Sequence, residues 1–380
     1  MAASSASSAS VSAAGAPALA ATYVYVSNAE DGDISSYTLQ VDGTLAAGAR
    51  TTVAGMVMPM AVSPDKRLLY AASRAKPFSV YTFTINPGNG ALRFLASSPL
   101  AESFPYISLD KSGRYLLGAS YAGHLVSVNA IGADGRVAAG ALQVVPVGRN
   151  AHSIRVDGSN KFLYVPCLGS DQIFQFSFDV ATGRLASSTP AVAQMPAMSG
   201  PRHFVTSSDN KFLYALSELK ATVTTFAINP ETGALAELTT VAGLPAGSTL
   251  GPGAPRGGAG LPGAPVRNTD NDIWAADIHI TPDDKFLYIS ERTSSSVGAF
   301  SVDAASGKLT FLGSTPTEKQ PRSFAISANG RFMVVSGEKS ATLSAYAIDE
   351  ASGALKLSGK APAGKGANWV EIVSFDQAPA

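Results

Sequence analysis

The 380-residue sequence predicts an all-β fold, a seven-bladed β-propeller with four-stranded antiparallel blades. Two observations predict it. A strand–turn–strand motif recurs six times at intervals of roughly 46 to 50 residues, with one longer interval, and a seventh copy is divided between the two ends of the chain. Regular repeats of this length with four strands each are typical of propeller blades. An open β-sandwich or two smaller domains would explain neither the spacing nor the divided copy.

Each repeat begins with a hairpin of two short apolar strands. The six copies are MAVSPDKRLLYAAS, ISLDKSGRYLLGAS, IRVDGSNKFLYVPC, FVTSSDNKFLYALS, IHITPDDKFLYISE and FAISANGRFMVVSG. Their turns are rich in Asp, Asn, Gly and Ser, which tolerate positive φ or bond their own backbone. A third, alternating strand such as QIFQFSFDV follows, and a turn such as ATGRL leads into a fourth strand. Each repeat therefore predicts one blade.

The divided repeat predicts how the ring closes. ANWVEIV, near the C-terminus, supplies the first strand of this blade. TYVYVSN, ISSYTLQ and TLAAGA, near the N-terminus, supply the other three. The C-terminal strand would pair beside the N-terminal strands, which removes the open sheet edges of an incomplete ring.

Two segments lie outside the repeat. Residues 1–21 are an uncharged Ala/Ser-rich leader that we expect to be disordered, because it cannot bury enough surface to fold alone. No Lys or Arg precedes its final ALAA, so we expect a cytoplasmic protein. A periplasmic location is the alternative if the leader is the remnant of an export signal. Residues 22–380 would form one propeller domain, with a Gly/Pro-rich loop insertion at about 242–268.

The composition argues against several classes of protein. The chain has 28 basic and 28 acidic residues and only 15% charged residues, so it lacks the basic stripe of a nucleic-acid-binding protein. A single cysteine, Cys167, allows neither an intramolecular disulfide nor a Cys/His metal cluster, and we expect it to be buried. No apolar run approaches the roughly 20 residues of a membrane helix. We expect a monomer without membrane contact, metal or cofactor.

Charged residues gather at one predicted mouth of the central channel. The first strand of every propeller blade lines this channel, so residues at equivalent repeat positions converge there. The position at the start of the first strand holds Met58, Tyr106, His152, Arg202, Ala276, Arg322 and Asn368. The position just after the second strand holds Arg74, Ala122, Leu168, Glu218, Arg292 and Glu338. Four arginines, two glutamates and a histidine are thus expected at one mouth.

This cluster predicts an anion-binding site. Bringing four arginines together is electrostatically costly unless an anion or the two glutamates offset their charge. Ion pairs between blades, without any function, are the alternative reading. The excess of arginine over glutamate and the neighbouring His152 favour a site.

The other histidines are assigned structural roles. His203 follows Arg202 in a strand and should point the opposite way, so we expect it to pack between blades. We expect His279, in the middle of a strand, to make a structural hydrogen bond, and His124 to lie in a loop. No GxSxG, HExxH, EF-hand or phosphate-binding glycine motif is present in the sequence.

From about Thr22 to Val373 the sequence resembles the bacterial propeller-type 6-phosphogluconolactonases of the lactonase propeller family. The runs WAADIHITPDDKFLY and GPRH with SEL carry the most specific part of the resemblance, and VSPDKRLLY, AHSI, LYVPCLGSDQI, ERTSSS, TEKQPRSFAIS and GEKS add to it. The resemblance implies hydrolysis of 6-phospho-D-glucono-1,5-lactone, a sugar lactone, to 6-phosphogluconate in the pentose phosphate pathway. A related branch, the carboxymuconate-lactonising enzymes, uses the same channel for a ring closure. The long insertion and the carboxylate of Glu338, where the family more often has an uncharged amide, depart from the pattern.

The resemblance also implies a catalytic set of a histidine, two arginines and a glutamate. These fall on His152 in AHSI, Arg202 in GPRH, Glu218 in SEL and Arg292 in ERT. We expect His152 or Glu218 to be the general base. A carboxylate held among arginines would be a weak base, whereas histidine normally titrates near neutral pH, which favours His152. Arg202 and Arg292 would polarise the lactone carbonyl.

The remaining charged residues of the mouth are assigned to substrate binding. Arg74 and Arg322 would grip the 6-phosphate bidentately, and Glu338 would weaken the positive field beside them. The leading hypothesis is therefore a metal-independent lactonase. A carboxymuconate-type lyase and a binding propeller without chemistry are the alternatives, because the fold alone does not define an activity.

Overall fold

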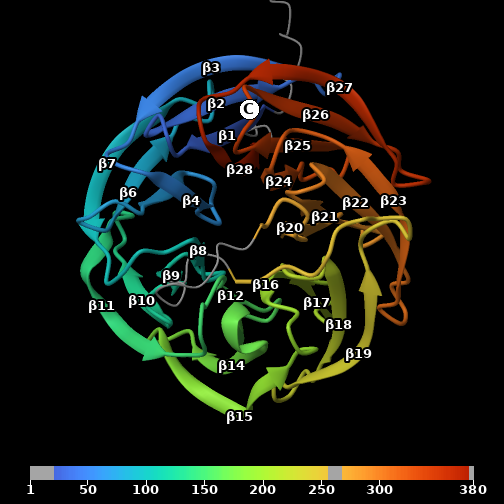
Figure 1. Cartoon of the computed structure of the whole chain (residues 1–380). Helices are drawn as coiled ribbons and strands as arrows, with labels where there is room; N and C mark the ends of the chain where they lie inside the picture. The colour runs from blue at the N-terminus through green and yellow to red at the C-terminus, as the bar shows by residue number, and fades with distance from the viewer. Residues whose placement is uncertain (1–20, 256–267, 376–380) are drawn as a thin grey trace, which may run out of the picture.

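The structure is a computed structural model that describes residues 21–255 and 268–375. Within these residues the chain forms seven four-stranded antiparallel sheets arranged around a central channel, which confirms the predicted propeller (Figure 1). Almost all of the predicted leader and part of the predicted insertion lie outside the described residues.

The blades follow one another along the chain, each with its first strand innermost. The first uninterrupted blade comprises β4 (Val57–Val62), β5 (Leu68–Ser73), β6 (Ser79–Ile85) and β7 (Leu92–Pro99). The second comprises β8 (Tyr106–Leu109), β9 (Tyr115–Ser120), β10 (Leu125–Ile131) and β11 (Val137–Pro146). The third comprises β12 (Arg155–Val156), β13 (Phe162–Cys167), the short 3₁₀ helix η1 (Leu168–Ser170), β14 (Gln172–Asp179) and β15 (Arg184–Gln194).

The remaining uninterrupted blades repeat this order. The fourth comprises β16 (Pro201–Thr206), β17 (Phe212–Ser217), β18 (Thr222–Ile228) and β19 (Leu235–Ala242). The fifth comprises β20 (Ala275–Ile280), β21 (Phe286–Glu291), β22 (Ser296–Val302) and β23 (Leu309–Pro316). The sixth comprises β24 (Pro321–Ile326), β25 (Phe332–Gly337), β26 (Thr342–Ile348) and β27 (Leu355–Pro362).

The divided blade closes the ring as the sequence predicts. It joins β28 (Ala367–Ser374) to β1 (Thr22–Asn28), β2 (Asp33–Leu39) and β3 (Leu45–Thr52). β28 pairs antiparallel with β1, so that Glu371 faces Tyr25 and Trp369 faces Ser27. The two ends of the described chain are therefore held in one sheet, and the innermost strand of that sheet comes from the C-terminal end.

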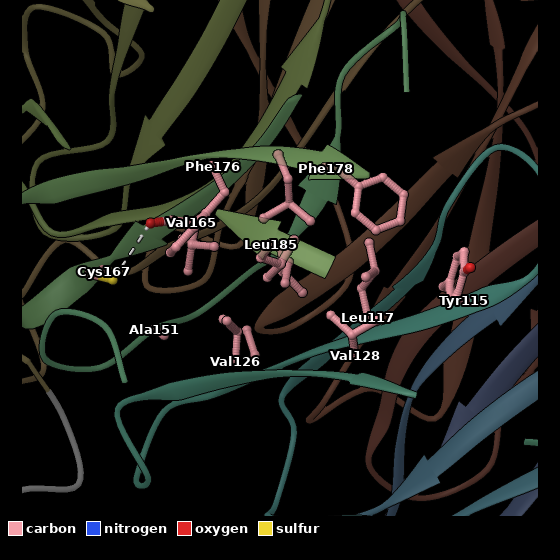
Figure 2. Packing of buried hydrophobic residues seen from close by; sticks show 13 residues of the cluster. Tyr115, Leu117, Val126, Val128, Ala151, Val165, Cys167, Phe176, Phe178 and Leu185 are labelled. Atoms are coloured by element: carbon pink, nitrogen blue, oxygen red, sulfur yellow. Dashed lines mark hydrogen bonds between the residues drawn. The ribbon is translucent and has the colours of Figure 1, made fainter. Parts of the chain in front are cut away.

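Apolar packing between neighbouring blades holds the ring together. Figure 2 shows one such cluster, to which Leu117 and Val128 of the second blade and Val165 and Phe176 of the third all belong. Cys167 belongs to this cluster and is buried, as predicted. Each of these side chains alternates inward from a strand, so the cluster follows directly from the period-two pattern of the repeat.

The repeated tyrosine of the second strand provides a further link between blades. The Tyr70 hydroxyl donates a hydrogen bond to the Gly135 carbonyl of the following blade at 3.0 Å. Tyr164 makes the same bond to Gly233 at 2.7 Å. In these two copies the ring is buried and its hydroxyl is satisfied, which favours tyrosine at this position of the motif, whereas the equivalent Tyr214 hydroxyl has no hydrogen-bond partner among the described residues.

The inner strands of several blades carry a register shift near their first residues. In β16 the shift lies between Pro201 and Phe204, and β20 and β24 have equivalent shifts. A β-bulge places an extra residue in one strand, which breaks the strict alternation of side chains. Arg202 and His203 therefore both lie on the channel side of β16.

The second blade has a different register from the one its sequence suggested. Tyr106 pairs with Ala119, as Ser323 pairs with Ser336 in the sixth blade. Tyr106 is thus equivalent to Ser323 rather than to Arg322. The alignment of this repeat was wrong by one residue, and Tyr121, not Ala122, is the equivalent of Glu338.

Candidate active site

The four predicted catalytic residues meet at one mouth of the channel. Arg202 lies near the start of β16 and Glu218 directly follows β17, so the hairpin brings them together. The Glu218 Oε2 atom accepts a hydrogen bond from Arg202 Nε at 2.9 Å and another from Arg292 Nη2 at 2.9 Å. Both arginines are only 1% exposed and Glu218 only 4%. One carboxylate thus holds two buried guanidinium groups in place.

Backbone carbonyls complete the positioning of the two arginines. Arg292 donates to the Trp274 carbonyl through Nε and to the Ala275 carbonyl through Nη2, both at 3.0 Å, and its guanidinium stacks on the Trp274 ring at 3.7 Å. Arg202 donates to the Ala276 carbonyl through Nη1. Among the described residues no acceptor is present for Arg202 Nη2 or Arg292 Nη1. Two donors therefore stay available to a ligand.

The two guanidinium groups are protonated at neutral pH despite their burial. Burial and the neighbouring arginines lower the pKa of Arg202 to about 9. Burial also lowers the pKa of Arg292, to about 10, and Glu218 opposes this change. The site keeps its positive charge in the absence of an anion.

His152 lies beside this cluster and is 5% exposed. Its ring meets the Tyr121 ring at 5.7 Å and the His203 ring at 5.2 Å, both edge to face. Its buried Nδ1 atom has no hydrogen-bond partner within the described part of the chain. Burial, reinforced by the positive charge of Arg202, holds the pKa of His152 well below its usual value. His152 is therefore neutral at pH 7 and can accept a proton.

Tyr121 was missed by sequence reasoning because of the one-residue error in the second repeat. It occupies the position just after the second strand, where the fourth blade has Glu218. Burial raises the pKa of Tyr121 to about 12, and the charges of Glu218 and Arg202 also act on its hydroxyl. The second repeat has Leu117 where most repeats have the central tyrosine, so the tyrosine that would have fixed the alignment is missing.

The predicted substrate-binding residues lie at the same mouth, further from Glu218. Arg322 Nη1 lies 3.7 Å from Glu338 Oε1, and their side chains are 12% and 21% exposed. Arg74 donates through Nε to Ser103 Oγ at 3.1 Å. Burial and the nearby charge of Arg322 lower the pKa of Arg74. The mouth thus gathers four arginines against two glutamates, an excess of positive charge that suits a phosphate dianion.

The described end of the insertion reaches this mouth. The Gly253 amide donates to the Leu219 carbonyl at 2.8 Å, and Leu219 directly follows Glu218. The Ile273 amide donates to the Gly251 carbonyl at 2.8 Å, which ties the insertion to the start of the fifth blade. These described residues of the insertion therefore border the charged mouth.

His203 lies on the channel axis, so the prediction that it packs between blades is wrong. Its Nδ1 atom lies 2.8 Å from Asp277 Oδ1, and its ring contacts Tyr106 at 4.9 Å and Trp369 at 6.2 Å. The register shift in β16 is the reason, because it turns His203 to the same side as Arg202. These three rings form an aromatic layer across the channel below the charged mouth.

The other two histidines behave as predicted. His279 Nε2 lies 3.4 Å from Asp277 Oδ2. His124 lies in the turn between β9 and β10, where its Nδ1 accepts a hydrogen bond from the Asn150 amide at 2.9 Å. Within the described ranges no group of three or more His, Cys, Asp or Glu side chains is arranged to hold a metal ion. The same ranges contain no helix that is long and apolar enough to span a membrane.

The fold and the charged mouth define a propeller of the lactonase type, and the chain belongs to the family described as "Lactonase, 7-bladed beta-propeller", which matches residues 18–372. The chain is 37% identical over 351 residues to a 6-phosphogluconolactonase of Serratia proteamaculans, covering 92% of this chain and 98% of that protein. It is 34% identical over 354 residues to a 6-phosphogluconolactonase of Pectobacterium carotovorum, covering 93% and 99%.

Solved structures share the same architecture. The periplasmic gluconolactonase of Pseudomonas aeruginosa has a TM-score of 0.79 at 25% identity, with coverage of 94% of this chain and 100% of that one. A protein from Lactobacillus plantarum has a TM-score of 0.80 at 23% identity, with coverage of 93% and 100%. At that identity the second likeness shows the fold alone.

Proposed function

We propose that this protein is a 6-phosphogluconolactonase, which hydrolyses 6-phospho-D-glucono-1,5-lactone to 6-phosphogluconate. The observation that carries the proposal is the excess of buried arginine over glutamate at one channel mouth, next to a neutral histidine. Curated relatives that cover nearly the whole chain bear the same name, which supports this choice of substrate.

The phosphate would bind at the outer pair of arginines. Arg322 is bonded only loosely to Glu338, at 3.7 Å, so its guanidinium can turn to a stronger acceptor. Arg74 is close enough to Arg322 for their charges to repel, and a dianion between them would relieve that repulsion. This placement directs the lactone ring toward Arg202 and Arg292.

The inner pair of arginines would stabilise the negative charge that forms on the lactone carbonyl oxygen. The free donors are Arg202 Nη2 and Arg292 Nη1, and both guanidinium groups are fixed by Glu218 before the substrate arrives. Preorganised donors of this kind contribute most when water is excluded. Because Glu218 Oε2 already accepts two charged hydrogen bonds, we assign Glu218 to positioning rather than to proton transfer.

His152 would act as the general base. It removes a proton from a water molecule as the water oxygen attacks the carbonyl carbon, and it returns that proton to the ring oxygen when the ester bond breaks. The low pKa of His152 in the empty site makes it a weak base. A bound phosphate dianion would offset the surrounding arginine charge and bring the pKa of His152 closer to neutral pH.

We also propose that the reaction needs no metal. A sugar lactone is a reactive ester, so a base and a cationic oxyanion site are enough to accelerate its opening. Treatment with a chelator followed by gel filtration should leave the initial rate unchanged. A rate that falls and returns when a divalent metal is added would contradict this part of the proposal.

The test is a proton-release assay on freshly made 6-phosphogluconolactone, corrected for spontaneous opening. We expect turnover well above background, and its loss in the Arg202→Ala and His152→Ala variants. Carboxymuconate absorbance is followed in parallel. Consumption of muconate without lactone turnover would indicate a lyase, and no turnover of either substrate would indicate a binding propeller.

A further inference from the structure

A cavity of about 490 Å³ opens at the channel mouth opposite the charged site. It is lined by the later residues of the inner strands and by the turns that follow them, including Asp110 and Lys111 after β8. The aromatic layer of Tyr106, His203 and Trp369 lies at its inner end. Its polar side chains include Arg155, His203, Asp277, His279 and Glu371. The catalytic proposal uses none of them.

Arg155 and Glu371 present unused hydrogen-bonding groups to this cavity. Arg155 donates through Nη1 to the Phe204 carbonyl at 3.3 Å, and its side chain also bonds the Tyr106 hydroxyl. A guanidinium carries five N–H groups, so Arg155 keeps further donors for a ligand. Glu371 Oε1 accepts from Trp369 Nε1 at 2.8 Å, and no described residue donates to its Oε2. The two side chains form no ion pair in the part of the chain that is described, although the charge of Arg155 acts on the Glu371 carboxyl. They therefore face the cavity as a separate donor and acceptor.

On another wall of the cavity, hydrogen bonds hold Asp277 in place. The Oδ1 atom of buried Asp277 lies 2.8 Å from His203 Nδ1 and accepts a hydrogen bond from the Ile278 amide at 3.1 Å. His279 meets the other carboxylate oxygen at 3.4 Å, and its side chain is 33% exposed. The described residues leave His279 Nδ1 without a partner. His279 is therefore a third side chain, beside Arg155 and Glu371, that can form a hydrogen bond with a ligand in the cavity.

We propose that this cavity is a second ligand site, for a neutral polyhydroxylated ring molecule such as an unphosphorylated sugar. Its volume lies within the range of small-molecule sites, about 300–1,000 Å³. Hydroxyl groups both donate and accept, which matches the separate donors and acceptors of Arg155, His279 and Glu371. The rings of Trp369 and Tyr106 offer apolar surface to the C–H groups of a sugar ring.

The charges of the cavity argue against a phosphorylated ligand. Asp277 and Glu371 both face it, so a phosphate would meet carboxylates as well as Arg155. The charged mouth has the opposite balance. The two ends of one channel would therefore select phosphorylated and unphosphorylated molecules, respectively. This inference does not depend on the proposed lactonase activity, because its test measures binding and not turnover.

The test is calorimetric titration of the full chain with D-glucose, D-galactose and D-xylose, and with D-glucose 6-phosphate as the matched phosphorylated probe. We expect at least one neutral sugar to bind, with affinity reduced at least about tenfold in both Arg155→Met and Glu371→Gln. The Arg322→Met variant, altered only at the opposite mouth, should keep that affinity. Its binding of D-glucose 6-phosphate should instead weaken.

Three results would overturn the proposal. The first is no heat of binding for any neutral sugar at about 50 mM, a concentration far above a millimolar Kd. The second is neutral-sugar binding that is unchanged in both Arg155→Met and Glu371→Gln. The third is neutral-sugar binding that is lost in Arg322→Met. Thermal melts of each variant establish that it is folded. Crystals of the unaltered chain soaked in the same sugar give a second readout, since sugar density in the charged mouth alone would also contradict the proposal.

Discussion

Arg202 Nε donates to Glu218 Oε2 over 2.9 Å, and both side chains are almost completely removed from solvent. Replacing Glu218 with Gln would leave two buried guanidinium groups without a counter-charge. Removal of one partner from a buried ion pair costs about 3–5 kcal/mol. We therefore expect Glu218→Gln to lower the free energy of unfolding by that amount in denaturant titrations.

The matched control is Glu30→Gln. Glu30 pairs with Lys339 at 3.3 Å, but both side chains are more than half exposed. Surface pairs contribute about 0–1 kcal/mol. Equal effects of the two substitutions would contradict the structural role of the Glu218 carboxylate.

His152→Gln should abolish most of the lactonase activity. Loss of a general base typically lowers kcat by about 10²–10⁴-fold. We expect kcat to fall within this range while KM changes little, because the phosphate contacts remain. His124→Gln, a substitution in a turn outside the site, is the control and should keep the full rate. A His152→Gln enzyme with normal kcat would remove His152 from the mechanism.

Arg322→Met should discriminate between phosphorylated and unphosphorylated substrates. A hydrogen bond to a charged group contributes about 1.5–3 kcal/mol, so KM for 6-phosphogluconolactone should rise by roughly 10- to 150-fold. KM for glucono-1,5-lactone should stay nearly constant. Glu338→Gln should lower KM for 6-phosphogluconolactone, since it removes the carboxylate that competes with the phosphate for Arg322. Equal changes for both lactones would contradict a phosphate site at Arg322.

Glu371 should make stability depend on pH. Burial raises the pKa of Glu371 from about 4.5 to about 7 in the folded protein. Between these values the folded state holds a proton that the unfolded state has lost, so its stabilising contribution is complete below about pH 4.5 and is lost as the pH rises through 7. Glu371→Gln cannot titrate. Its stability relative to the unaltered chain should therefore increase by on the order of 1–3 kcal/mol between pH 4.5 and pH 8.

Denaturant titrations at several pH values check this prediction. Buried His152 and His203 also change stability, because burial lowers their pKa values and the folded protein does not take up protons that the unfolded chain binds below about pH 6.5. Both proteins share this effect, so it cancels in the difference. Parallel stability curves for the two proteins would contradict the raised pKa of Glu371.

The architecture was predictable because the sequence repeats. Period-two strands, polar turns and the recurring tyrosine each follow from local chemistry, and the divided repeat requires ring closure. Residues equivalent in the repeat, such as Arg202 and Arg322, also converge at one mouth as predicted. The cellular location of the protein and the disorder of its leader stay predictions, because both were argued from residues 1–21, almost all of which lie outside the described part.

The errors arose where the chain departs from strict alternation. The register shift in β16 turns His203 to the channel, which a period of two cannot foresee. In the second repeat Leu117 replaces the central tyrosine, so the alignment moved by one residue and Tyr121 was missed. The cavity at the channel mouth opposite the charged site was not predicted either. Its polar residues, such as Arg155 and Glu371, occupy a row further along the inner strands, where neither motif nor charge excess singled them out.

The most direct measurement is a crystal structure of the protein with 6-phosphogluconate, the expected product. We expect the phosphate within hydrogen-bonding distance of Arg74 and Arg322, and the carboxylate at the free donors of Arg202 and Arg292, close to His152. Density for the product in the cavity lined by Arg155 and Glu371, with the arginine mouth empty, would contradict the assignment of the active site.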